Sequence, residues 1–338
     1  MGLFNVTCSS DARLDGKTAI ITGSNSGIGK CTAQDFYKRG ARVIMACRCL
    51  SKAEEAKEDI KKSCKSVEKI GEIVTVELDL ASIKSIRKCA EKILANEEEI
   101  NLLINNAGIM FCPEGRTEDG FEMQFGTNHL GHFLFTLLLL PKIVRSAPAR
   151  IVNISSCGHH LLWGPLAFDD LNWEKRRYNE KQAYYQSKLC NILFTKELTR
   201  RLADAQISGV TTYSLHPGMI NTDLLRHFDS AFFSGVQWIV RNIGTIFLKT
   251  PWQGAQTTIH CAVNEKAGKE SGLYYAECAI KNPSAKANRI EDAKLLWETS
   301  WEMVGLAHDY NPFDLHDSNP FNSIESSTTT SVAFSFRD

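Results

Sequence analysis

Two side chains with acid–base chemistry stand four residues apart in the segment 183–194 (AYYQSKLCNILF). The segment has helical periodicity, so this spacing places the Tyr184 phenol and the Lys188 amine on one face of a helix. A phenol with a pKa of about 10 exchanges protons poorly at neutral pH. A fixed ammonium one turn away stabilises the phenolate and lowers that pKa. The pair therefore predicts a general acid/base; the alternative is a half-buried tyrosine beside a solvated lysine.

Three further polar residues fall where a reacting group could lie. Ser155 and Ser156 close a predicted strand, where a hydroxyl can bind a carbonyl or alcohol oxygen or simply cap a turn. Asn128 is a polar amide inside an apolar helical segment (FGTNHLGHFLF), so it needs hydrogen-bond partners. It is a candidate site residue or a satisfied core amide.

A glycine-rich turn follows the first predicted strand. The run 22–29 (TGSNSGIG) lies between that strand and a helix. Glycines let the backbone approach a pyrophosphate, and the helix N-terminus offers free N–H groups and a positive dipole end. This placement predicts a dinucleotide site rather than an ordinary glycine turn.

Other residues at strand ends refine the prediction for the ligand. The second strand ends in Cys47 and Arg48, where an NAD site would place an acid and where an arginine suits a 2′-phosphate. This favours NADP(H), although Arg48 is alternatively a solvated strand-end residue. Asp79 and the run 105–108 (NNAG) also follow strands and face the ligand edge, with helix capping as the alternative for Asp79.

Strand-like and helix-like segments alternate along the chain. The expected strands are 17–22, 41–47, 73–80, 100–106, 150–156, 209–216 and 272–277, and the expected helices are 29–39, 51–64, 82–96, 120–145, 183–203, 252–263 and 287–304. Near-continuous apolar strands separated by helices imply a parallel sheet covered on both faces. We therefore expect an α/β fold: a single doubly wound Rossmann-type domain over residues 1–310, with a mostly parallel seven-stranded sheet and a flexible Ser/Thr-rich tail at 311–338.

Composition excludes several classes of protein. The 338 residues carry 39 basic and 39 acidic side chains, with 43% hydrophobic and 23% charged residues. This is an ordinary globular composition, and its zero net charge argues against a nucleic-acid partner. Eleven cysteines without a CxxC pair argue against a zinc ribbon or a disulfide framework and fit a reducing compartment; no metal site is expected.

The N-terminal residues show no signal peptide, and the longest apolar run (133–140) is too short to cross a bilayer. We expect a cytoplasmic protein. An apolar stretch within 224–249 (AFFSGVQWIVRNIGTIFL) leaves two interpretations open, a buried helical lid or a peripheral contact with the endoplasmic reticulum or another intracellular membrane.

Taken together, these motifs resemble the short-chain dehydrogenase/reductase family over residues 15–305. The motifs TGSNSGIG, LDL, NNAG, Asn128, the SS strand end, Tyr184-x-x-x-Lys188 and the run 216–218 (HPG) occur in the family's order. More narrowly, NHLGHFLFTLLLL, SAPARIVNISS and KTPWQGAQTTIHCA resemble the NADPH-preferring retinol dehydrogenase branch.

The resemblance implies roles for the matching residues. Tyr184 would be the general acid/base, Lys188 its pKa-lowering partner and a ribose ligand, Ser156 the carbonyl-orienting group, and Asn128 the holder of a relay water. The implied cofactor-binding residues are Gly23, Ser26, Gly27, Ile28, Gly29, Arg48, Asp79, Asn106, Ala107, Gly108, Tyr184, Lys188, Pro217, Gly218 and Thr222. A homodimer through paired long helices is usual for the family.

The leading prediction is an NADP(H)-dependent oxidoreductase for a small lipophilic carbonyl or alcohol, with retinal and retinol foremost. Residues 157–181 and 224–249 would shape the substrate site. Two alternatives stay open: a steroid or xenobiotic carbonyl reductase, and a non-catalytic protein that senses NADP(H).

Overall fold

The computed structural model describes residues 6–218, 220 and 249–314. The described residues form one eight-stranded sheet in the order β3-β2-β1-β4-β5-β6-β7-β8. The strands are β1 (Thr18–Thr22), β2 (Arg42–Cys47), β3 (Glu72–Glu77), β4 (Leu102–Asn105), β5 (Ala149–Ile154), β6 (Val210–His216), β7 (Leu273–Ala276) and β8 (Ala279–Ile280). The first seven strands pair in parallel, as predicted from the apolar strands.

The predicted count of seven strands is wrong by one. The two-residue strand β8 turns back antiparallel to β7. The turn between them uses Glu277 and Cys278, whose φ angles are 54° and 53°. Glycine or asparagine usually marks such a hairpin turn, and neither is present here, so the sequence carries no turn signal.

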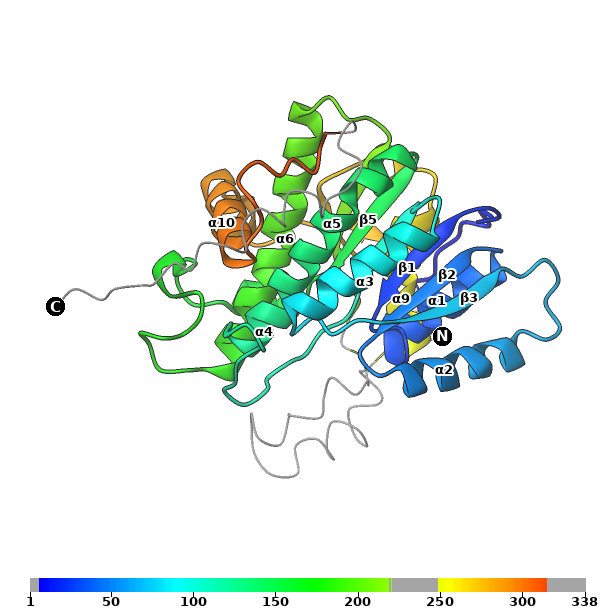
Figure 1. Cartoon of the computed structure of the whole chain (residues 1–338), viewed down its shortest axis with the longest axis horizontal. Helices are drawn as coiled ribbons and strands as arrows, with labels where there is room; N and C mark the ends of the chain where they lie inside the picture. The colour runs from blue at the N-terminus through cyan, green and yellow to red at the C-terminus, as the bar shows by residue number, and fades with distance from the viewer. Residues whose placement is uncertain (1–5, 219, 221–248, 315–338) are drawn as a thin grey trace.

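Two layers of helices cover the sheet (Figure 1). One face carries α1 (Gly27–Lys38), α2 (Leu50–Ser63) and α9 (Pro251–Val263), and the other carries α3 (Ile83–Asn96), α5 (Gly131–Arg145) and α6 (Glu180–Asp204). Because both faces are buried, all five residues of β1 lie in the interior. The chain leaves β1 toward β2 and β3 and then returns to the other side of β1 through β4, so the switch in strand order lies between β1 and β4.

A last helix, α10 (Ile290–Met303), packs on the outer side of α6. The Trp297 ring meets the Phe133 ring of α5 and the Phe194 ring of α6 at centroid distances of 5.2 and 5.9 Å. Farther along, the Tyr310 hydroxyl donates to the main-chain oxygen of Leu137 (2.8 Å). The C-terminal part of the described chain therefore covers the apolar surface of the two central helices.

The predicted helix over 120–145 is interrupted. The structure places a single turn, α4 (Met123–Phe125), before a π-helical segment, η1 (Gly126–Leu130), which leads into α5. An apolar pattern does not distinguish a π turn from an α turn. Such π segments occur frequently at functional sites, and this one contains Asn128.

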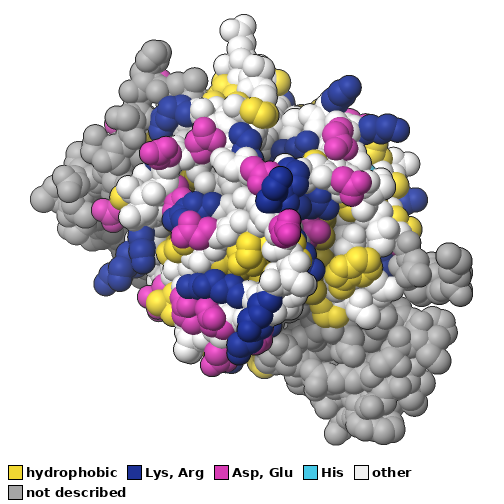
Figure 2. All heavy atoms as spheres, turned by 90° about the vertical axis from the view of Figure 1, so that its right-hand side faces the viewer, with side chains coloured by type: hydrophobic (Ala, Val, Ile, Leu, Met, Phe, Trp, Pro, Cys, Tyr) yellow, Lys and Arg dark blue, Asp and Glu magenta, His cyan; other side chains and the backbone are white. Residues whose placement is uncertain are grey.

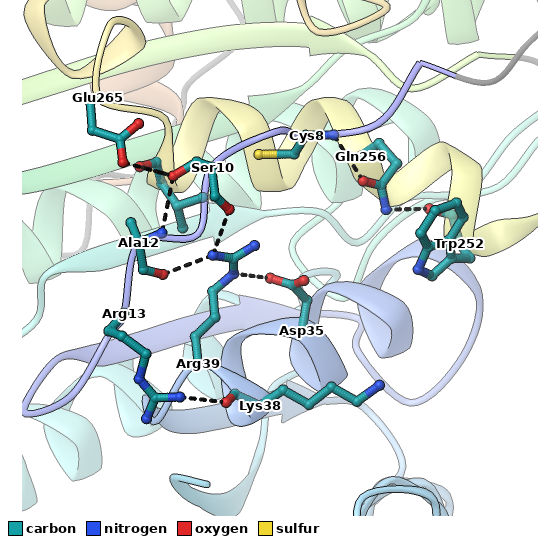
Figure 3. Close-up of polar contacts among 11 residues, drawn as sticks. Cys8, Ser10, Ala12, Arg13, Asp35, Lys38, Arg39, Trp252, Gln256 and Glu265 are labelled. Atoms are coloured by element: carbon teal, nitrogen blue, oxygen red, sulfur yellow. Dashed lines mark hydrogen bonds and ion pairs between the residues drawn. The ribbon is translucent and has the colours of Figure 1, made fainter. Parts of the chain in front are cut away.

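The N-terminal residues 6–15 lie across α1 and α9 (Figure 3). Arg39, at the end of α1, donates from Nη1 to the main-chain oxygens of Ser10 (2.9 Å) and Ala12 (2.8 Å). The Cys8 amide donates to the side chain of Gln256 on α9 (3.1 Å). These contacts fasten the N-terminal segment to both α1 and α9.

Charges of both signs mix on the side of the molecule where α2 and β3 lie (Figure 2). Lys57 pairs with Glu54, Lys61 with Glu58, and Lys30 of α1 with Asp59 (3.0, 3.3 and 2.9 Å). All eleven cysteines fall within the described residues, and none forms a disulfide. In the described part of the chain, no helix combines the length and the apolarity that a membrane span requires.

Candidate active site

The predicted acid–base pair lies on the buried side of α6. Asn179 caps this helix by accepting hydrogen bonds from the amides of Lys181 and Gln182. The side chains of Tyr184 and Lys188 are 5% and 3% exposed, and the Lys188 nitrogen lies 5.6 Å from the centre of the Tyr184 ring. The Lys188 nitrogen also donates to the main-chain oxygen of Ile154, at the end of β5 (3.1 Å). The spacing predicts only that the two side chains share one face of the helix. The structure in addition brings them to the carboxyl end of the sheet.

Burial sets the electrostatics of both groups. It raises the pKa of the Tyr184 phenol, and a hydrogen bond with Ser156 opposes that rise. Burial lowers the pKa of the Lys188 ammonium to about 8. At pH 7 the lysine therefore keeps its proton, and a positive charge stands beside the phenol with little water to screen it.

The two serines at the end of β5 play different parts. The Ser155 hydroxyl donates to the main-chain oxygen of Lys188 (2.6 Å), so it fastens α6 to the sheet. The Ser156 oxygen accepts from the Gly158 amide (3.1 Å) and caps the short 3₁₀ turn η2 (Cys157–Leu161). Ser156 is only partly buried and bonds to Tyr184, so it is the serine able to meet a reacting oxygen.

Asn128 is fully buried in the π segment η1. Its side-chain oxygen accepts from the Ile109 amide (2.9 Å), and its nitrogen donates to the Ile109 oxygen (2.9 Å) and the Ser187 hydroxyl (3.0 Å). These are the hydrogen bonds of a satisfied core amide. They also join the loop after β4 to α6, one residue from Lys188.

A relay of hydrogen bonds that the sequence does not reveal connects Asn128 to β1. The main-chain oxygen of Asn128 accepts from His132 Nδ1 (3.0 Å). His132 Nε2 must then accept from the Thr22 hydroxyl (2.9 Å). The Thr22 oxygen in turn accepts from the amides of Asn106 and Ala107 (both 2.9 Å). The relay fixes the relative positions of the glycine-rich turn, the NNAG turn and Asn128.

The glycine-rich turn leads into the N-terminus of α1. Gly23 and Gly27 have φ angles of 62° and 55°, a region that favours glycine. A side-chain carbon on Gly29 would lie 2.5 Å from the Gly23 oxygen and 2.6 Å from the Asn106 nitrogen, so this helix can approach the strand only with glycine there. Ser26 occupies the N-cap position of α1 and makes no side-chain capping bond, and Ile28 packs toward Gly254 of α9.

These features fit a dinucleotide. A turn of left-handed glycines meets the start of a twelve-residue helix at the switch in strand order, where backbone N–H groups can receive a pyrophosphate. Arg48 follows β2 on the same edge, is exposed, and makes no ion pair with any of the described residues. Its guanidinium is therefore available for a phosphate.

Other predicted cofactor residues lie along this edge. Asp79 uses its side chain to accept from the Ala81 amide (3.0 Å), while Ser82 caps α3, so Asp79 stabilises a turn and does not cap the helix. Asn106 donates to the oxygens of Thr22 and Gly23 (2.8 and 3.2 Å). Gly108 faces Asn128 and Lys188, because a side-chain carbon there would lie 3.3 and 3.5 Å from their polar atoms.

The segment after β6 closes the far side of the site. Pro217 and Gly218 follow β6, and Gly218 has a φ of 101°. Its α-carbon lies against the Lys249 side chain, whose nitrogen pairs with Glu277 (2.5 Å). Thr222 and residues 224–248 lie outside the described residues. Of the two predicted substrate segments, the structure therefore describes 157–181.

Sequence reasoning missed Phe111. Its ring meets the Tyr184 ring edge-on at 5.3 Å and the Tyr185 ring at 6.0 Å. It adopts a φ of 52°, unusual for a bulky residue, and its amide donates to the buried Gln124 side chain (2.8 Å). No motif marks it, because its place depends on this strained turn beside Tyr184 and Tyr185, which lie 73 and 74 positions later in the chain.

Comparisons with known proteins agree with this geometry. A family model described as short chain dehydrogenase matches residues 17–163. Human retinol dehydrogenase 11 is 46% identical over 89% of this chain and 90% of that protein, and human retinol dehydrogenase 13 is 48% identical over 88% of each. An uncharacterized protein from Mycobacterium paratuberculosis has a similar crystal structure (TM-score 0.68, 33% identity, 88% of this chain and 97% of that chain). L-sorbose reductase from Gluconobacter frateurii, solved with NADPH and L-sorbose, shares the fold (TM-score 0.60, 18% identity, 79% of this chain and 96% of that chain).

Proposed function

Because the chain belongs to the short-chain dehydrogenase/reductase family, in its retinol dehydrogenase-like branch, we propose that it interconverts a lipophilic aldehyde or ketone and its alcohol with NADP(H). The observation that carries this proposal is the meeting of Tyr184, Lys188, Ser156 and Asn128 at the carboxyl edge of the sheet, beside the glycine-rich turn. A retinal-like compound is the substrate class that we favour.

The dinucleotide, when bound, supplies or accepts the hydride. For reduction, Ser156 and Tyr184 would hold the carbonyl oxygen through their hydroxyl groups, and Tyr184 would donate the proton. Lys188 stabilises the phenolate that remains, because its buried ammonium keeps its charge at pH 7. Asn128 holds the loop after β4 and α6 at a fixed separation, so that these groups stay oriented.

Three features support NADP(H) over NAD(H). Arg48 stands at the end of β2, where an NAD site carries an acid, and the next residue along the chain is the uncharged Cys49. The guanidinium is exposed and unpaired among the described residues. A planar guanidinium binds a phosphate with paired, charge-assisted hydrogen bonds, which a ribose hydroxyl cannot match.

A lipophilic substrate is supported by the apolar groups around the phenol and by the relatives. Phe111 and Tyr185 pack against Tyr184, and Trp163, in the segment 157–181, is 74% exposed. The names of the relatives specify retinol for those proteins. Since such a substrate partitions into bilayers, we propose a cytoplasmic enzyme that meets its substrate at an intracellular membrane surface, such as the endoplasmic reticulum.

Initial rates with purified protein test the proposal. NADPH and NADH oxidation is measured with all-trans-retinal, aliphatic aldehydes and steroid ketones. We expect the fastest turnover with retinal and NADPH. Turnover confined to other carbonyls would reject the retinoid substrate and keep the reaction class. NADPH binding without turnover on any carbonyl would reject the enzyme and favour a cofactor-sensing protein.

A further inference from the structure

We propose that His159 is a positioning residue for the reaction: it holds the Ser156 turn in the orientation that presents the Ser156 hydroxyl to the substrate oxygen. The inference rests on the proposed function, because Ser156 matters only if a carbonyl or alcohol is bound beside Tyr184. His159 itself is fully buried and contacts no reacting group.

Two hydrogen bonds hold the His159 ring. Nδ1 lies 2.5 Å from the main-chain oxygen of Ser156, and Nε2 lies 3.0 Å from the Ser284 amide nitrogen. Ser284 precedes the short 3₁₀ turn η7 (Ala285–Asn288), 125 positions later in the chain. A second tie runs beside the first, since Lys286 donates to the main-chain oxygen of Leu162. The ring therefore bridges the Ser156 turn to a separate part of the fold.

The partners determine the protonation state of the ring. A carbonyl oxygen only accepts, so Nδ1 must carry a proton; an amide N–H only donates, so Nε2 must be bare. A second proton, on Nε2, would point at the N–H of Ser284 and break this hydrogen bond. Burial lowers the pKa of His159 to about 4, so the ring stays neutral at physiological pH.

The surroundings of the ring add no acid. The His160 ring of the same turn lies tilted against it, with 4.0 Å between centroids, and Tyr274 of β7 meets it edge-on at 5.2 Å. His216 of β6 also faces the ring. A positive charge on any one of His159, His160 and His216 is disfavoured by a charge on its neighbours. No carboxylate among the described residues pairs with His159, so nothing nearby compensates for a proton on the ring.

The position of the Ser156 oxygen follows from the ring. By holding the Ser156 carbonyl, His159 fixes the peptide plane between residues 156 and 157, and the His159 amide donates to the same oxygen (3.2 Å). The next peptide unit then follows through Cys157, and its Gly158 amide donates to the Ser156 hydroxyl oxygen (3.1 Å). Gly158 also lies close against the Tyr185 ring, because a side-chain carbon there would lie 2.7 Å from that ring.

Steady-state kinetics of two matched variants test the inference. His159→Phe keeps the ring packing and removes both hydrogen bonds. His308→Phe makes the same change at an exposed position outside the predicted substrate segments. We expect His159→Phe to lower kcat by about ten- to a hundredfold, with KM for NADPH within about twofold of the parent value. The pKa of Tyr184 in the pH–rate profile should rise, because its hydrogen bond from Ser156 loosens. His308→Phe should keep the parent rate and profile.

A conservative variant separates positioning from general damage. His159→Asn places an N–H at the location of Nδ1 without replacing Nε2, and should recover part of the lost kcat. Parent-like kcat and pH profile in His159→Phe, or equal changes in kcat and KM, would overturn the inference.

A substrate-free measurement keeps the inference distinct from the proposed function. In ¹⁵N-histidine NMR of the parent protein, His159 should stay neutral with its proton on Nδ1 down to about pH 5. A proton on Nε2, or titration near pH 6.5, would overturn the inference whether or not the protein turns over a carbonyl. The correct tautomer in a parent protein that reduces no carbonyl would instead reject the proposed function.

Discussion

Asn128 and Ile109 exchange two hydrogen bonds, one in each direction, across the gap between η1 and the loop after β4. A single amide side chain thus satisfies both main-chain groups of one residue. This relationship binds the π segment to the strand end that carries the NNAG turn. It makes Asn128 a structural member of the site as well as a candidate catalytic one.

Replacing Asn128 should therefore reduce stability and turnover together. In Asn128→Ala the amide and oxygen of Ile109, which is half-buried, lose their partners, and the loss costs about 2–4 kcal/mol. We expect this loss in the free energy of unfolding from urea titration, with a fall in kcat. Asn96→Ala, an exposed amide at the end of α3, serves as the control and should change stability by less than about 0.5 kcal/mol. Equal stabilities for the two variants would contradict the proposed linkage.

Tyr184→Phe should abolish turnover and leave NADPH affinity almost unchanged. The variant removes one hydroxyl and keeps the ring that packs on Phe111, so a drop of at least about a hundredfold in kcat reports lost proton transfer. Tyr185→Phe is the matched control, because no lysine stands four residues beyond it. Wild-type rates in Tyr184→Phe would remove this residue from the mechanism.

Arg48→Ala should weaken the binding of NADPH far more than the binding of NADH. A charge-assisted phosphate contact contributes about 1.5–3 kcal/mol, equivalent to roughly ten- to a hundredfold in Kd. Cofactor titrations by fluorescence measure both values, with exposed Arg145 of α5, changed to Ala, as the control. If NADPH and NADH affinities fall by the same factor, Arg48 does not bind the 2′-phosphate.

Acid should destabilise the protein through its buried imidazoles. Burial lowers the pKa of His129 to about 3 and that of His132 to about 4. In the unfolded chain both histidines have the ordinary pKa of about 6.5. Between these values the unfolded chain binds more protons, so the free energy of unfolding falls as pH falls from about 6.5 toward 4. We expect a loss of about 2 kcal/mol per histidine between pH 7 and pH 5.

Urea unfolding at several pH values checks this expectation. His129→Phe, which keeps an aromatic ring beside Phe125, should show a shallower dependence on pH. His308→Gln, at an exposed position, should retain the parent dependence. An unchanged slope in His129→Phe would show that His129 does not contribute.

Gly29→Ala should distort the cofactor turn. The added carbon would lie 2.5 Å from the Gly23 oxygen and 2.6 Å from the Asn106 side-chain nitrogen, well inside van der Waals contact, so the helix must move away from the strand. We expect NADPH affinity to fall by more than about tenfold, equivalent to about 1.4 kcal/mol. Gly115→Ala, where the nearest atom would be 3.9 Å away, should leave affinity unchanged. Comparable affinities would show that the close approach at Gly29 is dispensable.

Sequence patterns predicted the parallel sheet because its strands are buried on both faces and their apolar runs are unbroken, as in β1. The pairing of Tyr184 with Lys188 was equally predictable, since both lie on one helix and their spacing alone places them on one face. The π segment and β8 were missed because neither has a pattern of its own: one is apolar like its neighbours, and the other follows a turn without glycine.

Contacts between distant segments were beyond sequence reasoning. Thr22 and His132 are 110 positions apart, and the role of His159 depends on Ser284. Each of these residues is ordinary in its local context, and only folding brings the partners together. The expected homodimer, peripheral membrane contact and C-terminal tail stay predictions.

The packing of α10 has a consequence for how the chain reaches this structure during synthesis. Trp297 covers Phe133 and Phe194, and Tyr310 reaches Leu137, 173 positions earlier. Because the ribosome synthesises the N-terminal part first, the apolar surface of α5 and α6 remains exposed to solvent until α10 emerges. Contacts of such long sequence separation also slow folding. Nascent chains that stall before residue 290 therefore expose the surface that chaperones bind.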